Sequence, residues 1–313
     1  ATKMATTISQ SSPVQLKSLP NFRSVVPGRL YRSSRPDLIT EKDFETVQRL
    51  GLRCIVDFRS VAEYRSFKGK TKFVDEDFRV VKVKPPTRGD RSNGLRYQYY
   101  NNGSHGGTGS NGDVKSKGFH YFINFFTMQY VWRVFTRVPW YMQLYSLMYL
   151  VYDLIFWTNY VHFVRFFARI LLNKAGLIRQ YVDIVELSQG AIYSALKLLS
   201  DPQNLPANLC CAHGKDRTGI VVTMVMGCLG MSRDEIIEEY ARSEAGLSPI
   251  IDRVEKEVCD RFHMDISFIT AKKDTMRGLL EYIDKQYGSI PDYLESIGFS
   301  RANQEQLKRN LQA

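Results

Sequence analysis

One stretch of the chain indicates the fold: Cys211-Ala212-His213-Gly214-Lys215-Asp216-Arg217-Thr218-Gly219. The short uncharged run Ala207–Cys210 precedes it, and the uncharged run Ile220–Leu229 follows it. The first run has the length of a short strand, and the second is apolar on all sides, which is typical of a buried helix. A strand, a tight polar loop and a buried helix are therefore expected in this order.

The loop between these runs suits a phosphate dianion. Backbone N–H groups at a helix N-terminus point at a bound anion, and the helix dipole adds positive charge there. Gly214 and Gly219 permit tight turns, and the planar fork of Arg217 matches two phosphate oxygens. The residues expected against the substrate are Ala212, His213, Gly214, Lys215 and Gly219.

The same surroundings favour the thiolate form of Cys211, because a helix N-terminus and nearby cations stabilise negative charge. The Thr218 hydroxyl is expected to donate a hydrogen bond to this thiolate. Such a sulfur attacks phosphorus in line and gives a phosphocysteine that water then hydrolyses. The segment therefore predicts a cysteine-dependent phosphatase, with Cys211, Arg217 and Thr218 in catalytic roles.

Two carboxylates are candidates for the acid that protonates the leaving oxygen. Asp57 follows the apolar run Cys54–Val56, so a buried strand is expected to deliver it at its carboxyl end. Asp216 lies inside the loop beside Arg217. The sequence leaves both assignments open. It favours Asp57 as the acid, with Asp216 as the base of the water step or as an organiser of Arg217.

Several motifs along the chain resemble the atypical tyrosine and lipid phosphatases known from bacteria and fungi. They are Asn21-Phe22-Arg23, Leu30-Tyr31-Arg32-Ser33, Val56-Asp57-Phe58-Arg59-Ser60 with Glu63, the loop itself, Tyr287-Gly288-Ser289 and Tyr293-Leu294. The resemblance covers residues 21–311 except 87–118. It implies one α/β phosphatase domain over 21–313, with a central, mostly parallel sheet flanked by helices. It also implies activity on phosphotyrosine, phosphoserine/threonine or phosphoinositides.

Two positions depart from the family pattern. Cys210 stands where His usually precedes the nucleophile, and His213 stands where Ala is common. Cys210 is expected to be a buried, inert thiol, with a strained disulfide to Cys211 as the alternative. His213 and Lys215 make the loop rim basic, which shifts the expected substrate toward a phosphoinositide head group, with phosphotyrosine as runner-up. A silent phosphate-binding module and an arsenate-reductase-like enzyme remain alternatives.

Net charge and cysteine count indicate which partners and which compartment to expect. The formal charge of +11 favours phosphorylated proteins, phosphoinositides or an anionic membrane surface. No nucleic-acid partner is expected, because the usual motifs are missing from the sequence. Five scattered cysteines indicate a reducing compartment, the cytoplasm, and their spacing predicts neither a metal nor another cofactor. Three arginines, Arg32, Arg35 and Arg59, are candidates for contacts with the charge of the substrate.

Three segments are expected outside the core of the domain. Residues 1–20 are polar and predict a disordered tail, with a transit peptide as the alternative. Residues 87–118 are rich in Gly, Asn and Ser and predict a flexible loop. Residues 119–172 hold all three tryptophans and predict an aromatic-rich helical insertion.

The insertion has two main interpretations. A single transmembrane span would place Asp57 and Cys211 on opposite sides of the bilayer, and the internal charges argue against two spans. A helical lid over the catalytic loop is the leading prediction. Tyr, Trp and Arg in alternation also suit an interfacial helix pair on an anionic membrane, which remains a second role.

Overall fold

A seven-stranded sheet forms the centre of the described part of the chain. The computed structural model describes residues 16–66, 77–99, 117–158 and 160–313. The strand order is β1-β2-β7-β3-β6-β4-β5, with β1 and β5 antiparallel at the two edges and the five strands between them parallel. The strands are β1 Arg23–Val26, β2 Leu30–Ser33, β3 Cys54–Asp57, β4 Phe78–Lys84, β5 Arg96–Tyr99, β6 Gly118–Ile123 and β7 Ala207–Cys210. The predicted α/β fold with a mostly parallel sheet is confirmed.

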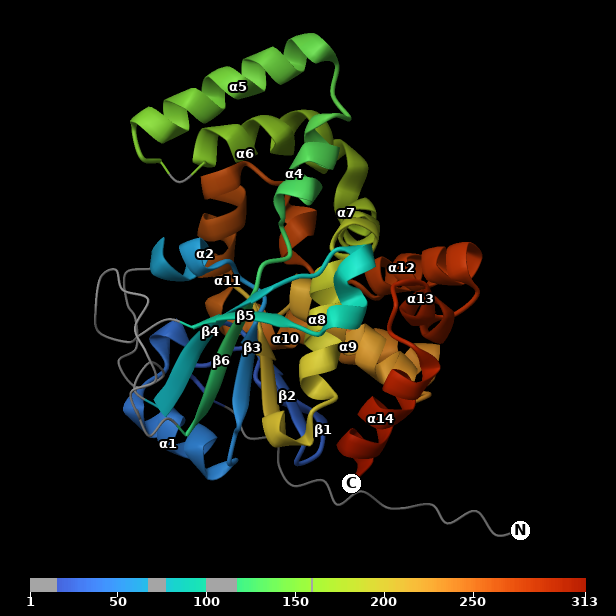
Figure 1. The fold of residues 1–313 in the computed structure, drawn as a ribbon. Coiled ribbons are helices and arrows are strands. Elements are labelled where there is room, and N and C mark those ends of the chain that lie inside the picture. Colours follow the sequence, from blue (N-terminus) through green and yellow to red (C-terminus); the bar gives the residue numbers. More distant parts are fainter. Residues whose placement is uncertain (1–15, 67–76, 100–116, 159) are drawn as a thin grey trace.

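Helices cover both faces of the sheet and extend beyond its carboxyl edge (Figure 1). The α-helices are α1 Glu41–Arg49, α2 Val61–Ser66, α4 Met128–Phe135, α5 Trp140–Ile155, α6 Val161–Phe167, α7 Asn173–Leu187, α8 Gln189–Leu199, α9 Asp216–Cys228, α10 Arg233–Leu247, α11 Ile251–Glu255, α12 Lys273–Tyr287, α13 Ile290–Ser296 and α14 Arg301–Gln312. Short 3-10 helices lie at Pro36–Leu38, Arg88–Asn93, Pro202–Asn204, Ser248–Ile250 and Ile266–Ile269, and π-helical turns at Ala168–Leu172 and Lys256–Asp260.

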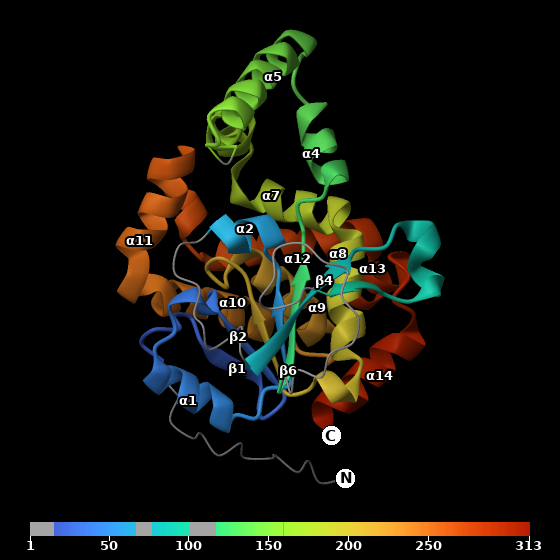
Figure 2. The same ribbon diagram turned by 60° about the vertical axis from the view of Figure 1, so that its left-hand side comes forward.

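The alternation of side chains along β3 builds two cores. Ile55 packs with Phe44 and Val47 of α1 on one face of the sheet. Val56 and Leu209 point to the other face, into the large core shared with the buried helix α9. Figure 2 shows α1 on one side of the sheet and α8, α9 and α14 on the other. Every residue of β3 and β7 is buried, which explains why the two strands are mostly apolar.

Parallel pairing brings the ends of three strands to one place. Asp57 at the end of β3 lies opposite Cys210 at the end of β7, and Ser33 at the end of β2 lies on its other side. Ligands of open α/β sheets bind outside these carboxyl ends. The predicted loop after Cys210 therefore begins where this fold places its sites.

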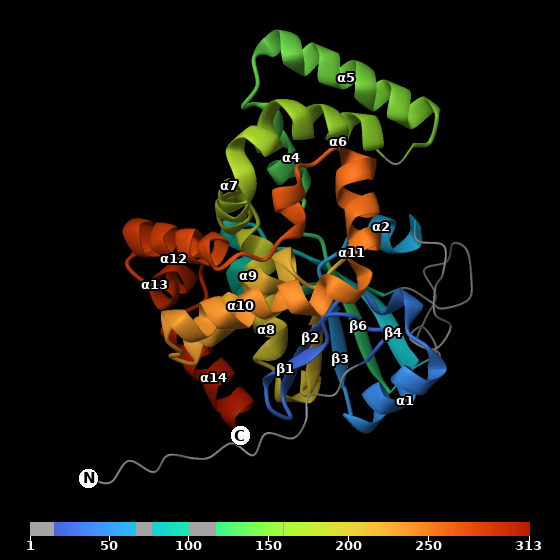
Figure 3. The ribbon, with the colours of Figure 1, turned by 180° about the vertical axis from the view of Figure 1, so that it is seen from behind.

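The aromatic segment is partly strand, contrary to the expectation of helices throughout residues 119–172. Residues Gly118–Ile123 form β6, between β3 and β4 inside the sheet. Aromatic residues suit a buried strand as well as a helix, so composition did not separate the two. The helices α4, α5 and α6 follow, and α5 lies at the end of the molecule opposite α1 and the C-terminal helix α14 (Figure 1). Figure 3 shows α11 standing below α6.

Two other predicted segments are more ordered than expected. Leu16 and Leu19 are buried beside α1, and Ser18 donates to Asp43, so residues 16–20 are not part of a disordered tail. Within the predicted loop 87–118, residues 88–93 form a 3-10 helix and Arg96–Tyr99 pairs with β4 as an edge strand. Polar and aromatic residues alternate in Arg96–Tyr99, and pairing with β4 orders this short segment. Residues 1–15 and 100–116 lie outside the described part.

The buried helix predicted at Ile220–Leu229 is confirmed as part of α9, which begins four residues earlier. The helices α7 and α8 meet at Ser188, whose hydroxyl donates to the Phe125 carbonyl. Among the residues that the structure describes, no helix is both long and apolar enough to cross a bilayer.

Candidate active site

The loop Cys211–Lys215 connects β7 to α9 at the carboxyl edge of the sheet. Cys211 follows the last strand residue and is 2% exposed. Asp216 and Arg217 are the first two residues of α9. The N-terminus of a 13-residue helix therefore faces the thiol, and its unpaired N–H groups and dipole favour an anion at this point.

Residues from the N-terminal motifs hold the loop from behind. Asn21 donates to the carbonyls of His213 and Gly214 at 3.1 and 3.0 Å. Arg32 donates to the carbonyls of Gly214 and Lys215. The backbone N–H of Arg35, just after β2, donates to the Ala212 carbonyl at 3.3 Å. A trans peptide places C=O and the next N–H on opposite sides. With the carbonyls turned outward, the N–H groups of residues 213–216 turn toward the anion site.

Gly214 is required at its position for two reasons. Its φ of +65° lies in the left-handed region that favours glycine. A Cβ atom there would also lie 2.0 Å from the Ser33 carbonyl oxygen. The loop can approach the end of β2 this closely only without a side chain.

Arg217 is fixed at the edge of the site by three contacts. Its Nη1 donates to the Phe58 carbonyl at 2.9 Å, and its guanidinium pairs with Glu63 at 3.2–3.3 Å. It also lies over the ring of Phe126, 5.1 Å from the centroid. Burial by itself would lower the pKa of Arg217, but Glu63 and Cys211 raise it above its ordinary value. The guanidinium is a permanent cation held in one orientation.

A cavity of about 490 Å³ opens above Cys211. Cys211, Ala212, His213, Lys215, Asp216 and Arg217 line its floor. Apolar side chains from other elements form much of its wall: Phe126, Tyr160, Val164, Ile184, Val254, Val258, Phe262, Met264 and Phe268. Tyr160 and Val164 belong to the segment 119–172, so this segment contributes directly to the wall of the cavity.

Asp216 faces this cavity and is held by its neighbours. Its side chain is 30% exposed, and it accepts a hydrogen bond of 2.7 Å from the Tyr181 hydroxyl. Tyr181 in turn contacts the hydroxyl of Tyr240 at 2.8 Å. The Lys215 ammonium lies 3.3 Å from the same carboxylate. Asp216 is therefore oriented and also accessible to a substrate.

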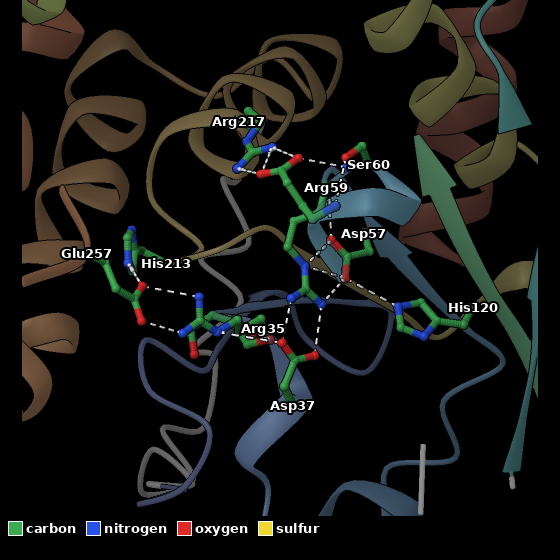
Figure 4. A network of polar contacts seen from close by, with 12 residues as sticks. Arg35, Asp37, Asp57, Arg59, Ser60, His120, His213, Arg217 and Glu257 are labelled. Carbon is green, nitrogen blue, oxygen red and sulfur yellow. Dashed lines mark hydrogen bonds and ion pairs between the residues drawn. The ribbon is translucent and has the colours of Figure 1, made fainter. Parts of the chain in front are cut away.

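Asp57 is placed differently (Figure 4). It is fully buried, is not part of the cavity wall, and accepts from Arg59 at 2.7–3.0 Å and from His120 at 3.4 Å. Arg59 bridges it to Asp37. Burial by itself would raise the pKa of Asp57, but Arg59 and His120 outweigh burial and hold the pKa well below its ordinary value. Neither Asp57 nor Arg59 reaches the site.

The basic residues of the loop are already paired. His213 contacts Glu257 at 2.9 Å, and Glu257 also binds Arg35 (Figure 4). Burial alone would raise the pKa of Glu257, but these two partners lower it to about 2. Lys215 is 1% exposed and donates to the carbonyls of Phe268 and Thr270. The basic rim expected from the sequence is thus largely neutralised.

The remaining predicted residues lie in or behind the loop. Thr218 is fully buried, and its hydroxyl has no hydrogen-bond partner among the described residues, which leaves it able to donate to an anion in the loop. Gly219 packs against Tyr240 in the first turn of α9. Cys210 and Cys211 are both free thiols, and Cys210 is buried on the α1 side of the sheet. Burial raises the pKa of Cys210.

Three site residues were not assigned roles from the sequence. Glu63 lies in a Ser60-x-x-Glu63 capping pattern, and both bonds of the capping box are present. That pattern signals a helix start but not the pairing with Arg217. Glu257 and Tyr181 carry no local signal, because their partners lie 44 and 35 residues away along the chain. No group of three His, Cys, Asp or Glu side chains suited to a metal occurs in the described ranges.

Comparison with known proteins gives two results. A family model described as the tyrosine phosphatase family matches residues 17–118 and 168–313. The segment 119–167, which contains α4, α5 and α6, lies outside this match. The chain is also 30% identical over 135 residues to the triple specificity protein phosphatase PtpB of Mycobacterium tuberculosis. That alignment covers 39% of this chain and 48% of PtpB, so the chain spans about half the length of this relative.

Proposed function

Because this chain belongs to the tyrosine phosphatase family, we propose that it hydrolyses phosphate monoesters with Cys211 as nucleophile. The observation that carries the proposal is the placement of Cys211 and Arg217 together at the floor of one cavity. Inward-turned N–H groups surround them, and a helix N-terminus faces them. This arrangement provides a nucleophile and a preorganised oxyanion site for the same phosphorus atom.

The proposed reaction has two displacements. The Cys211 thiolate attacks phosphorus, so that an S–P bond forms and the P–O bond to the leaving group breaks. The leaving oxygen takes a proton from Asp216. Water then attacks the phosphocysteine and gives its proton to Asp216, and the S–P bond breaks to release inorganic phosphate. Arg217 and the loop N–H groups bind the equatorial oxygens throughout.

The sequence favoured Asp57 as the general acid. We assign this role to Asp216 instead. Asp216 faces the cavity, whereas Asp57 is buried and bonded to Arg59 and His120. A general acid must reach the leaving oxygen directly or through one water. The position of Asp57 gives it a structural role instead, since it holds Arg59 and the end of β3.

The pH dependence of activity tests this assignment. We expect Asp216→Asn to lower kcat/KM on phosphotyrosine about 10²–10³-fold and to remove the basic limb of the pH–rate profile. The loss should be smaller on p-nitrophenyl phosphate, whose leaving group needs little protonation. Asp57→Asn is the matched control and should keep both limbs. If Asp57→Asn instead loses the basic limb, the assignment of Asp216 is wrong.

The cavity favours a substrate with one phosphate and an apolar body. Its aromatic wall suits the ring of phosphotyrosine. A head group with several phosphates would need free cations, and both His213 and Lys215 are already paired. We therefore propose phosphotyrosine as the first substrate and phosphoinositides as the second, the reverse of the order that the sequence suggested. The name of the relative, a triple specificity phosphatase, supports activity on more than one kind of phosphate ester.

Phosphate release from a substrate panel tests the function. The panel holds peptides with phosphotyrosine, phosphoserine or phosphothreonine and phosphoinositides with one, two or three ring phosphates, with Cys211→Ser protein as the blank. We expect the highest kcat/KM on phosphotyrosine and measurable release from singly phosphorylated inositol lipids. Release no faster than the blank from every substrate would overturn the phosphatase proposal. Release from phosphoinositides alone would overturn the order of substrates.

An anionic membrane is proposed as a working surface of this enzyme. The net charge of +11 favours such a surface, and phosphoinositides are presented there. The helices beside the cavity are rich in aromatic residues that suit the boundary between lipid and water.

A further inference from the structure

Helix α5 buries polar residues and exposes apolar ones. Ser146 and Asp153, two of its few polar residues, are buried at 0% and 2% exposure. Asp153 accepts from the backbone N–H groups of His162 and Phe163 and from the His162 ring at 2.8 Å. A helix on the surface of a protein in water normally buries its apolar stripe and exposes its polar residues. Here the polar residues face the protein.

The outward side of α5 is a continuous apolar stripe. Its members recur at helical spacing and are all more than half exposed: Trp140, Leu144, Met148, Val151 and Ile155. Tyr141, Tyr145 and Tyr152 flank the stripe and are exposed as well. We call this surface the α5 face. An exposed apolar patch of this kind marks a contact with a membrane or another protein.

The charges around the α5 face have one sign. In the whole segment 119–172, Asp153 is the single acidic residue, and it is buried. The basic residues Arg133 and Arg169 of the same segment are exposed, whereas Arg137 is already paired with Asp183 of α7. The region therefore presents apolar side chains beside positive charge and exposes no negative charge among its described residues.

We propose that the α5 face docks on an anionic lipid bilayer, with α5 lying in the plane of the interface. This inference deepens the proposed membrane contact and does not depend on turnover. Positive charge beside the face complements anionic head groups, whereas two copies of the same face would repel each other. The 16-residue helix is about 24 Å long and shorter than a hydrocarbon core of about 30 Å, which suits a helix in the plane.

Docking would place the catalytic cavity close to the lipid surface. α5 packs on α6 through the ring pairs Tyr149–Phe166 and Tyr152–His162. Val164 of α6 lines the cavity, and α6 lies between α5 and the rest of the molecule (Figure 1). The segment that makes this contact lies outside the match to the family model.

The tryptophans give a direct measurement on the unmodified chain. All three, Trp132, Trp140 and Trp157, lie in this region and are 63–88% exposed. We expect their fluorescence to shift to shorter wavelength on vesicles of phosphatidylcholine with phosphatidylserine, and brominated lipid to quench it. Vesicles of phosphatidylcholine alone should give a weaker signal. No shift and no quenching on either kind of vesicle overturns the proposal.

Paired variants locate the contact. Met148→Ser/Ile155→Ser removes two outward aliphatic side chains and should lower co-sedimentation with the anionic vesicles at least about tenfold. Leu38→Ser/Ile266→Ser removes two exposed aliphatic side chains elsewhere and should bind as the wild type does. Equal binding by the α5 variant and the wild type contradicts the proposal. Light scattering tests whether a second copy of the chain occupies the face instead. If the wild type is a dimer that does not bind vesicles, and Met148→Ser/Ile155→Ser is a monomer, the face is a dimer interface and the docking proposal is wrong.

Catalysis and docking fail separately in this design. Cys211→Ser should bind vesicles as tightly as the wild type, because Cys211 lies at the cavity floor and not on the α5 face. A protein that releases phosphate from phosphotyrosine but ignores vesicles keeps the proposed function and loses the docking proposal. A protein that binds vesicles and releases no phosphate keeps the docking proposal and loses the proposed function.

Discussion

Cys211→Ser is expected to lower kcat/KM on phosphotyrosine on the order of 10⁴-fold or more, with the fold unchanged. A serine hydroxyl is not ionised at neutral pH, so the helix N-terminus and Arg217 would face a neutral nucleophile in place of a thiolate. Cys211 lies in the loop with 2% exposure, and serine is close to it in size. The loop can therefore still bind phosphate after the change.

Two measurements separate this result from general damage. Cys228→Ser changes a partly buried cysteine on the same helix α9 and should keep the wild-type rate. Acid quenching during turnover should trap phosphate on the wild-type protein and none on Cys211→Ser. A silent phosphate-binding module would show no turnover to lose. Full activity of Cys211→Ser would remove Cys211 from the mechanism altogether.

Asp57→Asn is expected to lower the free energy of unfolding by about 3 kcal/mol, because removal of one partner leaves a buried charge uncompensated. Arg59 is 1% exposed and, among the residues that the structure describes, would keep Asp37 as its carboxylate partner. The melting temperature should fall by about 6 °C. Asp90→Asn is the matched control: it breaks an exposed ion pair with Arg96 and should cost about 1 kcal/mol or less.

The effect of Asp57→Asn should also depend on pH. The pKa of Asp57 is lowered in the folded state, so the carboxylate contributes stability above its unfolded-state pKa of about 3.9. That contribution is lost as the pH falls below about 4. Denaturant unfolding should show the full difference between wild type and Asp57→Asn at neutral pH and a shrinking one at lower pH. A difference independent of pH would mean that the charge of Asp57 is not what stabilises the fold.

The loop Cys211–Lys215 was predictable as a connection from strand to helix because its signals are local. It lies between two uncharged runs, and each run is long enough to indicate its own secondary-structure element. The parallel sheet followed from the resemblance and from the buried character of β3 and β7. The strand β6 was missed because its aromatic residues continue into helices of the same composition.

The surroundings of the two carboxylates could not be predicted, because they include residues far away along the chain. Asp57 lies two residues before Arg59 and Asp216 directly before Arg217, and this similarity hid their difference. The structure separates them: Asp57 is buried and bonded to Arg59 and His120, whereas Tyr181 holds Asp216 at the cavity. His213 likewise finds Glu257, a residue 44 positions away. Such long-range pairing decides which charges remain available to a substrate.

One chain of polar contacts joins the catalytic loop to the middle of the sheet (Figure 4). It runs through His213, Glu257, Arg35, Asp37, Arg59, Asp57 and His120. Energetic effects within such a network are not additive. Redesign for thermal tolerance commonly replaces buried ion pairs with apolar side chains, which often stabilises a protein. In this protein the same ion pairs hold His213 in the loop through Glu257 and Arg35. Replacing them with apolar side chains would therefore change the catalytic rate as well as the thermal stability.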